Sequence, residues 1–182
     1  VTFRAAGTSL SGQAISDSIL VRLGPGWNRY RVFDNAAKIQ LQPGIIGGQA
    51  NRILAEFDRK IGPDPASIDS AKIGGILANN ASGMCCGVEQ NSYRTLDAMR
   101  IILADGTIVD TGDDKSKAAC RRSHPALVEG LAALRDRVQN DAELSERIRY
   151  KFKIKNTTGY SLNALIDFTD PFDVMQHLMI GS

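Results

Sequence analysis

Two glycine-rich segments constrain this chain of 182 residues more than any other feature of its sequence. The first, Arg4 to Gln13, reads Arg-Ala-Ala-Gly-Thr-Ser-Leu-Ser-Gly-Gln, and the second runs from Gly62 to Gly83. Small residues around glycine let the backbone curl, so that several amide N–H groups converge on one point. Such a concavity binds an anion without a lysine, and Ser and Thr hydroxyls add donors. Two such loops facing one another would suit a diphosphate.

The familiar nucleotide signatures are absent from both segments. There is no Gly-x-x-x-x-Gly-Lys-Ser/Thr, and no Gly-x-Gly-x-x-Gly follows a strand. A helix beginning near Ile73 would point its N-terminal amides and positive dipole end at the same anion. A single glycine-rich turn is more often only a turn, but two in one chain favour a ligand. The residues by themselves therefore predict a phosphate-bearing cofactor, with a dinucleotide favoured.

Composition and cysteine usage narrow the class of protein. The chain is 43% hydrophobic and 23% charged, as expected of a globular protein with a core of its own. No apolar run approaches the roughly 18 residues of a spanning helix. The cysteines are Cys85, Cys86 and Cys120; an odd number with an adjacent pair predicts a reducing, intracellular setting. Adjacent cysteines seldom complete a zinc site, so no metal is predicted.

The charge is distributed unevenly along the chain. The net charge is +2, yet residues 115–155 hold 11 Lys and Arg against 5 Asp and Glu. We therefore divide the chain into a strand- and turn-rich cofactor-loop part (1–114), a basic helical insertion (115–155) and a closing segment (156–182). Both ends look like cuts through structure, and the chain is expected to be a piece of a larger protein.

Hydrophobic patterns predict an α+β fold. Strands are expected at 18–23, buried on one or both faces, and at 29–33, 38–41, 99–104 and 107–110. Asp105-Gly106 predicts a type I′ hairpin turn between the last two strands, and the polar stretch 111–117 predicts a loop. A helix is predicted at 47–57, with Ile53, Leu54 and Phe57 inward, and another at 141–150, with Leu144 and Ile148 inward. Between them a longer helix is predicted to begin with Ser123 as its cap and Pro125 in its first turn. The side chains expected to face inward from this longer helix are Leu127, Val128, Leu131, Leu134 and Val138.

At the two glycine-rich segments the sequence resembles the FAD-linked oxidases of the vanillyl-alcohol-oxidase and p-cresol-methylhydroxylase type, above all the bacterial D-lactate dehydrogenases and their glycolate-oxidase relatives. Residues 4–13 and 62–83 are similar to the two pyrophosphate loops of that family. Residues 92–106 resemble its next strand and turn, and residues 156–165 and 177–182 resemble the close of its FAD domain. The resemblance implies an α+β FAD-binding domain of the p-cresol methylhydroxylase type, with two small α/β subdomains, truncated here at both ends.

The resemblance also implies a set of cofactor-binding residues. Relatives that attach FAD covalently use a His or Cys in these loops; the first loop here has neither, and Cys85-Cys86 follow the second, so noncovalent FAD is expected. The implied FAD contacts are Ala6, Gly7, Thr8, Ser9, Leu10, Ser11 and Gly12 in the first loop, and Pro63, Asp64, Ala66, Ser67, Ile73, Gly74, Gly75, Asn79, Ala81, Ser82 and Gly83 in the second.

The chemistry implied by the family is hydride transfer from C2 of a D-2-hydroxy acid, D-lactate being favoured, to FAD, with electrons passing to a quinone or cytochrome. Glycolate or D-2-hydroxyglutarate is the alternative substrate, and a non-catalytic module with an acidic partner is the alternative class. No catalytic residue is identified. The substrate residues are expected in a cap domain beyond Ser182, so this piece alone is not expected to be catalytically competent.

Histidines and basic residues outside the loops have simpler interpretations. His177 lies in an apolar stretch and is expected to be structural, whereas His124 is expected at the surface or as a cap. No nucleic-acid motif is present, so weak contact with an anionic membrane surface is the expected role of the basic run, in a cytoplasmic protein peripheral to the inner face of the membrane. The basic run comprises Arg147, Arg149, Lys151, Lys153 and Lys155, interleaved with Tyr150 and Phe152.

Overall fold

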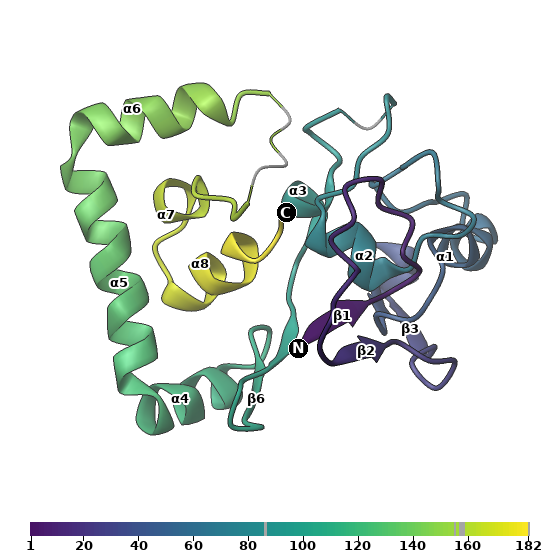
Figure 1. Ribbon diagram of the computed structural model, residues 1–182, viewed down its shortest axis with the longest axis horizontal. Helices are drawn as coiled ribbons and strands as arrows, with labels where there is room; N and C mark the ends of the chain where they lie inside the picture. The colour runs from purple at the N-terminus through teal and green to yellow at the C-terminus, as the bar shows by residue number, and fades with distance from the viewer. Residues whose placement is uncertain (86, 155, 157–158, 182) are drawn as a thin grey trace. The chain divides into compact units, whose positions relative to one another are not determined.

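A computed structural model describes residues 1–85, 87–154, 156 and 159–181 (Figure 1). The expectations that involve Cys86, Lys155, Thr157, Thr158 and Ser182 lie outside the described residues. The chain divides into two compact units, Val1–Ser92 and Tyr93–Ser182, which are described one at a time. Within the described residues no helix has the length and apolar character needed to cross a bilayer.

The first unit begins with a parallel strand pair. β1 (Thr2–Arg4) runs beside β2 (Leu20–Arg22), with Phe3 opposite Val21. β2 lies inside the predicted strand 18–23, but all three of its residues are exposed, so the expected burial is wrong. In the described chain this sheet consists of β1 and β2 only, and a strand buries its side chains only where a further layer covers it.

An antiparallel pair and a helix complete the framework of the first unit. β3 (Tyr30–Phe33) and β4 (Lys38–Leu41) pair in the register Tyr30 opposite Leu41, which confirms both predicted strands. The 3-10 turn η1 (Asp34–Ala36) joins them. α1 (Gly47–Ala55) confirms the helix predicted at 47–57. Leu54 is buried as predicted. Phe57 is exposed, because α1 ends at Ala55, before this residue.

The core of the first unit forms where α1 meets α2 (Ile73–Ala78). Main-chain hydrogen bonds tie α1 to the segment before α2, from Gly47 N to the Ala71 carbonyl at 2.9 Å and from Gly48 N to the Ile68 carbonyl at 2.8 Å. This close approach requires glycine, because a side chain at Gly47 would collide with that of Ile68. The buried apolar residues of this core are Ile45, Ala50, Ala71, Ile73 and Ile76.

The second unit opens with a hairpin. After α3 (Ser92–Thr95), β5 (Arg100–Ile102) pairs antiparallel with β6 (Ile108–Asp110), as predicted. The predicted type I′ turn is wrong, because pairing stops at Ile102 and Ile108 and leaves a longer connection. Gly106 N donates to the Leu103 carbonyl at 2.9 Å, and Gly106, with φ +88°, is the left-handed residue of the turn. A tight turn followed by a left-handed glycine is the usual solution for a hairpin loop of this length.

Helices α4 (Asp114–Ser123) and α5 (Pro125–Asn140) correct two further predictions. The stretch 111–117 is not all loop, because the Asp113 carboxylate accepts a hydrogen bond from Lys115 N and starts α4 at Asp114. Ser123 does not cap α5: it is the last residue of α4, and its hydroxyl donates to the Ala119 carbonyl. Pro125 occupies the first turn of α5 as predicted.

Helices α4, α5 and α6 (Ala142–Lys151) follow one another around α7 (Ala164–Asp167) and α8 (Pro171–Leu178) in Figure 1. α6 confirms the helix predicted at 141–150; Asp141 caps it and Ile148 is buried. The stripe on α5 is narrower than predicted, because Val128, Leu131 and Val138 are buried while Leu127 and Leu134 stay exposed. The short α7 and α8 were not predicted.

His177 on α8 is part of a buried aromatic cluster. Its ring stacks on Phe168 with centroids 4.0 Å apart and meets Tyr93 edge-on at 5.1 Å. Its Nδ1 lies 2.8 Å from the carbonyl oxygen of Asp173, so Nδ1 carries the hydrogen of the neutral ring. Burial lowers the pKa of His177, although the Asp173 carbonyl, the carboxylates of Asp173 and Asp167 and the Leu96 carbonyl act in the opposite direction. These contacts are those of a structural histidine.

Because the folded state holds His177 neutral, acid is expected to destabilise the second unit. The unfolded ring takes up a proton near pH 6.5 and the folded ring at lower pH, so the free energy of unfolding should fall as the pH drops below about 6.5. One proton accounts for at most about 1.4 kcal/mol per pH unit. Urea unfolding followed by circular dichroism from pH 7.5 to 5 measures the slope. His177→Gln should flatten this slope, and a variant slope equal to that of the unchanged chain would contradict the assignment.

Candidate cofactor site

The loop that follows β1 has the backbone geometry of an anion-binding turn. Gly7 and Gly12 both adopt left-handed conformations, with φ of +72° and +74°. Within the described residues the amides of Gly7, Thr8 and Gly12 donate no hydrogen bond. The loop is held at its far end by the Ser9 hydroxyl, which donates to the Gln13 side-chain oxygen. Glycine is required at these two positions because an L side chain is strained at such φ values.

A cation that the sequence interpretation did not place among the site residues lies against this loop. A side chain added at Gly7 would come within 2.6 Å of Nε and Nη2 of Arg4, so the guanidinium folds directly over Gly7. Within the described residues Arg4 forms no ion pair. The signal for it was present, since Arg4 opens the glycine-rich segment, but the prediction assigned anion binding to main-chain amides and to Ser and Thr hydroxyls.

The structure brings the beginning of the first glycine-rich segment onto the second. A side chain at Gly75 would lie 3.2 Å from the Cβ of Ala5, so Ala5 packs against the first turn of α2. Leu23, which follows β2, lies against Gly74 in the same way, at 3.4 Å. Figure 1 shows the chain after β1 passing beside α2. The expected proximity of the two segments is therefore present in the first unit.

The N-terminal amides of α2 are not available to an anion, although the sequence predicted that they would be. Ile73 N donates to the Ile45 carbonyl at 2.8 Å, and Gly74 N donates to the Pro43 carbonyl at 3.0 Å. Gly75 N and Ile76 N both donate to the Lys72 carbonyl. The amides in the first turn of α2 are therefore satisfied by protein carbonyls, whereas those of Gly7, Thr8 and Gly12 in the loop after β1 are not, within the described residues.

The two ends of the second segment are in direct contact. A side chain at Gly83 would overlap the carbonyl oxygen of Asp64. The backbone after α2 therefore lies directly against the backbone at the start of the second glycine-rich segment. Lys60 pairs with Asp64 at 3.4 Å on the exposed side. Between these points Ala81 N donates to the Ile76 carbonyl at 2.8 Å and ends the helix. Glycine at position 83 is thus a requirement of close packing.

The residues predicted to contact a cofactor differ in their accessibility. Pro63 and Ile73 are buried, and Ile73 belongs to the core between α1 and α2. Half-buried positions are Ala6, Ser9, Asp64, Ser67, Gly74, Gly75, Asn79, Ala81, Ser82 and Gly83. Exposed positions are Gly7, Thr8, Leu10, Ser11, Gly12 and Ala66. The contact of each with a cofactor stays a prediction, but the exposed and half-buried ones can present backbone or side chain to a ligand.

The described cysteines lie outside the two glycine-rich segments of the sequence. Cys120 is buried in the second unit, where burial and then the Asp105 carboxylate raise the pKa of its thiol despite the nearby Arg121. Cys85 is exposed just beyond the second segment. Among the described residues no group of three His, Cys, Asp or Glu side chains is arranged to hold a metal ion. Within the described residues, the two glycine-rich loops thus remain the candidate cofactor site.

The family model described as "FAD binding domain" matches residues 1–112, which include both glycine-rich segments. The chain belongs to this FAD-binding family. The predicted family and its cofactor, FAD, are confirmed, and the fold is α+β as predicted. The division into two small α/β subdomains stays a prediction. The residues present fit the group: left-handed glycines with free amides, beside an arginine without an ion-pair partner in the described chain, match a doubly negative pyrophosphate.

The curated relatives of this chain are dehydrogenases and an oxidase subunit by name. The chain is 35% identical over 118 residues to D-lactate dehydrogenase [cytochrome] 1, mitochondrial, of Saccharomyces cerevisiae, covering 59% of this chain and 19% of the relative. It is 28% identical over 111 residues to D-2-hydroxyglutarate dehydrogenase of Escherichia coli, covering 60% and 11%. It is 27% identical over 116 residues to glycolate oxidase subunit GlcD of Escherichia coli, covering 63% and 23%. The chain thus spans under a quarter of each relative. No solved structure matches it.

The crossing of Gly83 over Asp64 can be tested by substitution. Gly83→Ala should lower the free energy of unfolding of the first unit by about 1–3 kcal/mol, because the new methyl group overlaps a main-chain carbonyl that cannot move independently. Gly26→Ala is the matched control, since nothing lies within 4 Å of a side chain added there, and it should change stability by less than about 0.5 kcal/mol. Urea unfolding followed by emission of the single tryptophan, Trp27, measures both. Equal stability of the two variants would contradict the packing described.

Proposed function

We propose that this chain is the FAD-binding portion of an oxidoreductase that oxidises a D-2-hydroxy acid. The observation that carries the proposal is the loop after β1, in which left-handed Gly7 and Gly12 leave amides free beside Arg4. The family match supplies the identity of the ligand. The names of the relatives, which act on D-lactate, D-2-hydroxyglutarate or glycolate, support the substrate class.

D-lactate is our preferred substrate within that class, and a quinone or cytochrome our preferred electron acceptor. The yeast relative, 35% identical over 118 residues, is named for D-lactate and for cytochrome. Glycolate or D-2-hydroxyglutarate is the alternative, because relatives with those names match over a similar number of residues. The family match covers a cofactor-binding domain, and residues that select the substrate are expected elsewhere in the parent protein.

The role of the chain itself is to bind and orient the cofactor. The amides of Gly7, Thr8 and Gly12 would donate to the pyrophosphate of FAD, and the Thr8 and Ser11 hydroxyls would add donors at the exposed rim. Arg4 offsets part of the negative charge from one side. Bound FAD supplies the hydride acceptor, and the protein supplies position and electrostatics. The chain contributes no His or Cys to the first loop, in keeping with the noncovalent attachment that we propose.

A direct test is FAD binding by the 182-residue chain. Gly7→Ala should weaken FAD binding at least tenfold, because the added methyl group is strained at φ +72° and displaces the Arg4 guanidinium. Gly26→Ala should bind as the unchanged chain does. Titration followed by flavin fluorescence gives the affinities, and acid precipitation should leave the flavin in the supernatant. Equal affinity of the Gly7→Ala variant, in a chain with unchanged circular dichroism, would refute the loop assignment.

We also propose weak contact between the helical second unit and an anionic membrane surface. Within the described residues Arg147, Arg149 and Lys151 on α6 form no ion pair, and Tyr150 beside them is 73% exposed. Lys153 lies 6.0 Å from the Tyr150 ring centroid. An exposed aromatic ring among unpaired cations suits the boundary between headgroups and water.

Co-sedimentation with vesicles tests this contact. The chain should bind vesicles containing phosphatidylserine and release them in high salt, because the attraction is electrostatic and screened. Changing Arg147, Arg149 and Lys151 together to Gln should reduce binding at least tenfold, at about 1 kcal/mol for each charge. Changing Arg29, Arg31 and Arg59 of the first unit to Gln is the charge-matched control. Binding that ignores salt and lipid charge would rule the contact out.

A further inference from the structure

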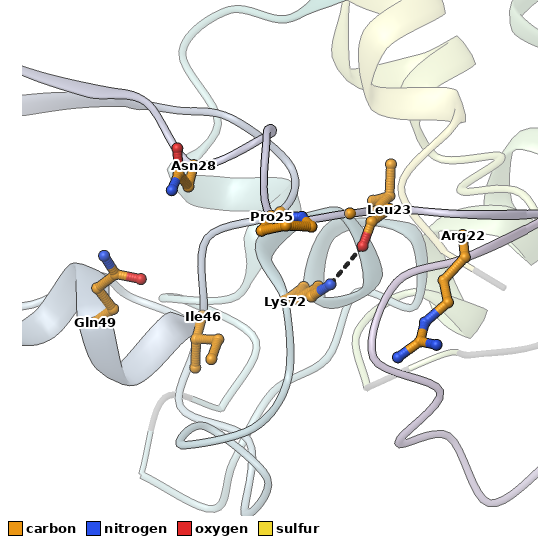
Figure 2. A pocket seen from close by; sticks show the side chains of 9 residues that line it. Arg22, Leu23, Pro25, Asn28, Ile46, Gln49 and Lys72 are labelled. Atoms are coloured by element: carbon orange, nitrogen blue, oxygen red, sulfur yellow. Dashed lines mark hydrogen bonds between the residues drawn. The ribbon is translucent and has the colours of Figure 1, made fainter.

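A pocket in the first unit is lined by none of the residues predicted to contact FAD. It has a volume of about 560 Å³, a size typical of small-molecule sites. Figure 2 shows its walls, which come from the end of β2, the turn after it, the turn before α1, α1 itself and the residue before α2. The lining residues are Arg22, Leu23, Gly24, Pro25, Asn28, Gly44, Ile46, Gln49 and Lys72.

The walls of this pocket are tied together by the main chain. Lys72 Nζ donates to the Leu23 carbonyl at 2.6 Å, which joins the residue before α2 to the end of β2 (Figure 2). A side chain at Gly44 would overlap the carbonyl oxygen of Trp27, so the turn after β2 closes directly onto the turn before α1. Arg29 N donates to the Gln42 side-chain oxygen at 2.9 Å and holds the same two turns. The pocket is therefore defined by contacts that stay in place without a ligand.

The charge of the lining has one sign. It includes the cations Arg22 and Lys72 and no carboxylate. Within the described residues neither cation forms an ion pair. Lys72 is half-buried and has one hydrogen-bond partner in the described chain, although an ammonium group has three donors. A partly desolvated cation with unused donors favours a negatively charged partner.

Neutral donors and apolar surface complete the lining. The side-chain amides of Asn28 and Gln49 have no hydrogen-bond partner among the described residues, and each can donate to an oxyanion. Leu23, Pro25 and Ile46 form apolar walls between these groups, as Figure 2 shows. A few polar groups around an apolar wall are the usual composition of a site for a small organic ligand.

We propose that this pocket binds a small organic oxyanion, a carboxylate or a phosphate monoester, with Lys72 as its main contact and Gln49 and Asn28 as further donors. Arg22 at the rim adds long-range attraction. The site is separate from the FAD loops, because its lining contains none of the residues predicted to hold the cofactor. The proposal does not rest on the proposed function, since it follows from the charge and construction of the pocket alone.

The test uses the 182-residue chain without FAD, titrated at constant ionic strength with inorganic phosphate in one arm and acetate in the other. Emission of Trp27, whose carbonyl lies against Gly44, and the amide resonances of Gly24 and Gly44 report on the pocket. Saturable changes are expected in at least one arm. The stronger arm identifies the ligand as a phosphate or a carboxylate.

Substitutions separate ligand binding from the structural role of Lys72. Lys72→Met should weaken binding at least tenfold, and Lys72→Arg should retain most of it. Gln49→Leu should weaken binding severalfold while leaving the bond from Lys72 to Leu23 in place. Lys60→Met, which removes a cation of the same unit outside the pocket, should bind as the unchanged chain does.

Three outcomes would overturn the proposal. The first is the absence of a saturable change in both arms. The second is equal binding by the Lys72→Met, Gln49→Leu and Lys60→Met variants, which would indicate general charge screening. The third is competition, in which FAD abolishes the response to phosphate or acetate and so makes the pocket a part of the cofactor site. Failure of the chain to bind FAD would leave the first two results unaffected, so the two proposals fail independently.

Discussion

The first unit depends on the close approach of backbone to backbone at the start of α2. The carbonyls of Pro43 and Ile45 accept hydrogen bonds from Gly74 and Ile73, so the turn before α1 and the first turn of α2 form one rigid joint. A side chain at Gly74 would lie 2.9 Å from Pro43, too close for an ordinary contact. Because α2 is held in this way, Ala5 can rest on Gly75 and the loop after β1 begins from a fixed position.

Because of this joint, the two glycine-rich segments differ in which of their amides have hydrogen-bond partners. The first-turn amides of α2 in the second segment donate to protein carbonyls. In the first segment the amides of Gly7, Thr8 and Gly12 have no partner among the described residues, and these three residues are exposed. The same joint forms one wall of the pocket around Lys72, since Gly44 and Ile46 flank the carbonyl that anchors Ile73. One short stretch of close packing thus positions both the cofactor loop and the candidate anion pocket.

The second unit is built on a different principle. Its stability comes from apolar side chains on α5, α7 and α8, with Phe172 and Val174 almost fully buried, and from one buried cluster of rings around His177. The family match ends at residue 112, before α4 begins, so most of these helices lie outside the stretch that defines the family. The basic surface of α6 belongs to this part of the chain.

Local patterns were sufficient to predict elements whose signal is contained in a few neighbouring residues. β3, β4, the hairpin of β5 and β6, α5 and α6 all follow from hydrophobic period and capping chemistry. Prediction failed where residues outside the local pattern decide where a helix begins or which of its side chains are buried. Ser123 ends one helix instead of starting the next because Asp113 begins α4 ten residues earlier, and Leu127 and Leu134 stay exposed because α7 and α8 cover only one side of α5.

For the cofactor site, the sequence by itself determined which residues are flexible enough to curl around an anion, since left-handed φ values at Gly7 and Gly12 follow from the absence of a side chain. Only the tertiary structure decided which amides remain free. Hydrogen-bond partners such as Pro43 and Ile45 lie about 30 residues away from the helix they satisfy, and the guanidinium of Arg4 folds back over its own loop. A donor is available to a ligand only if the rest of the chain leaves it unpaired, and that is a property of packing, which local sequence does not encode.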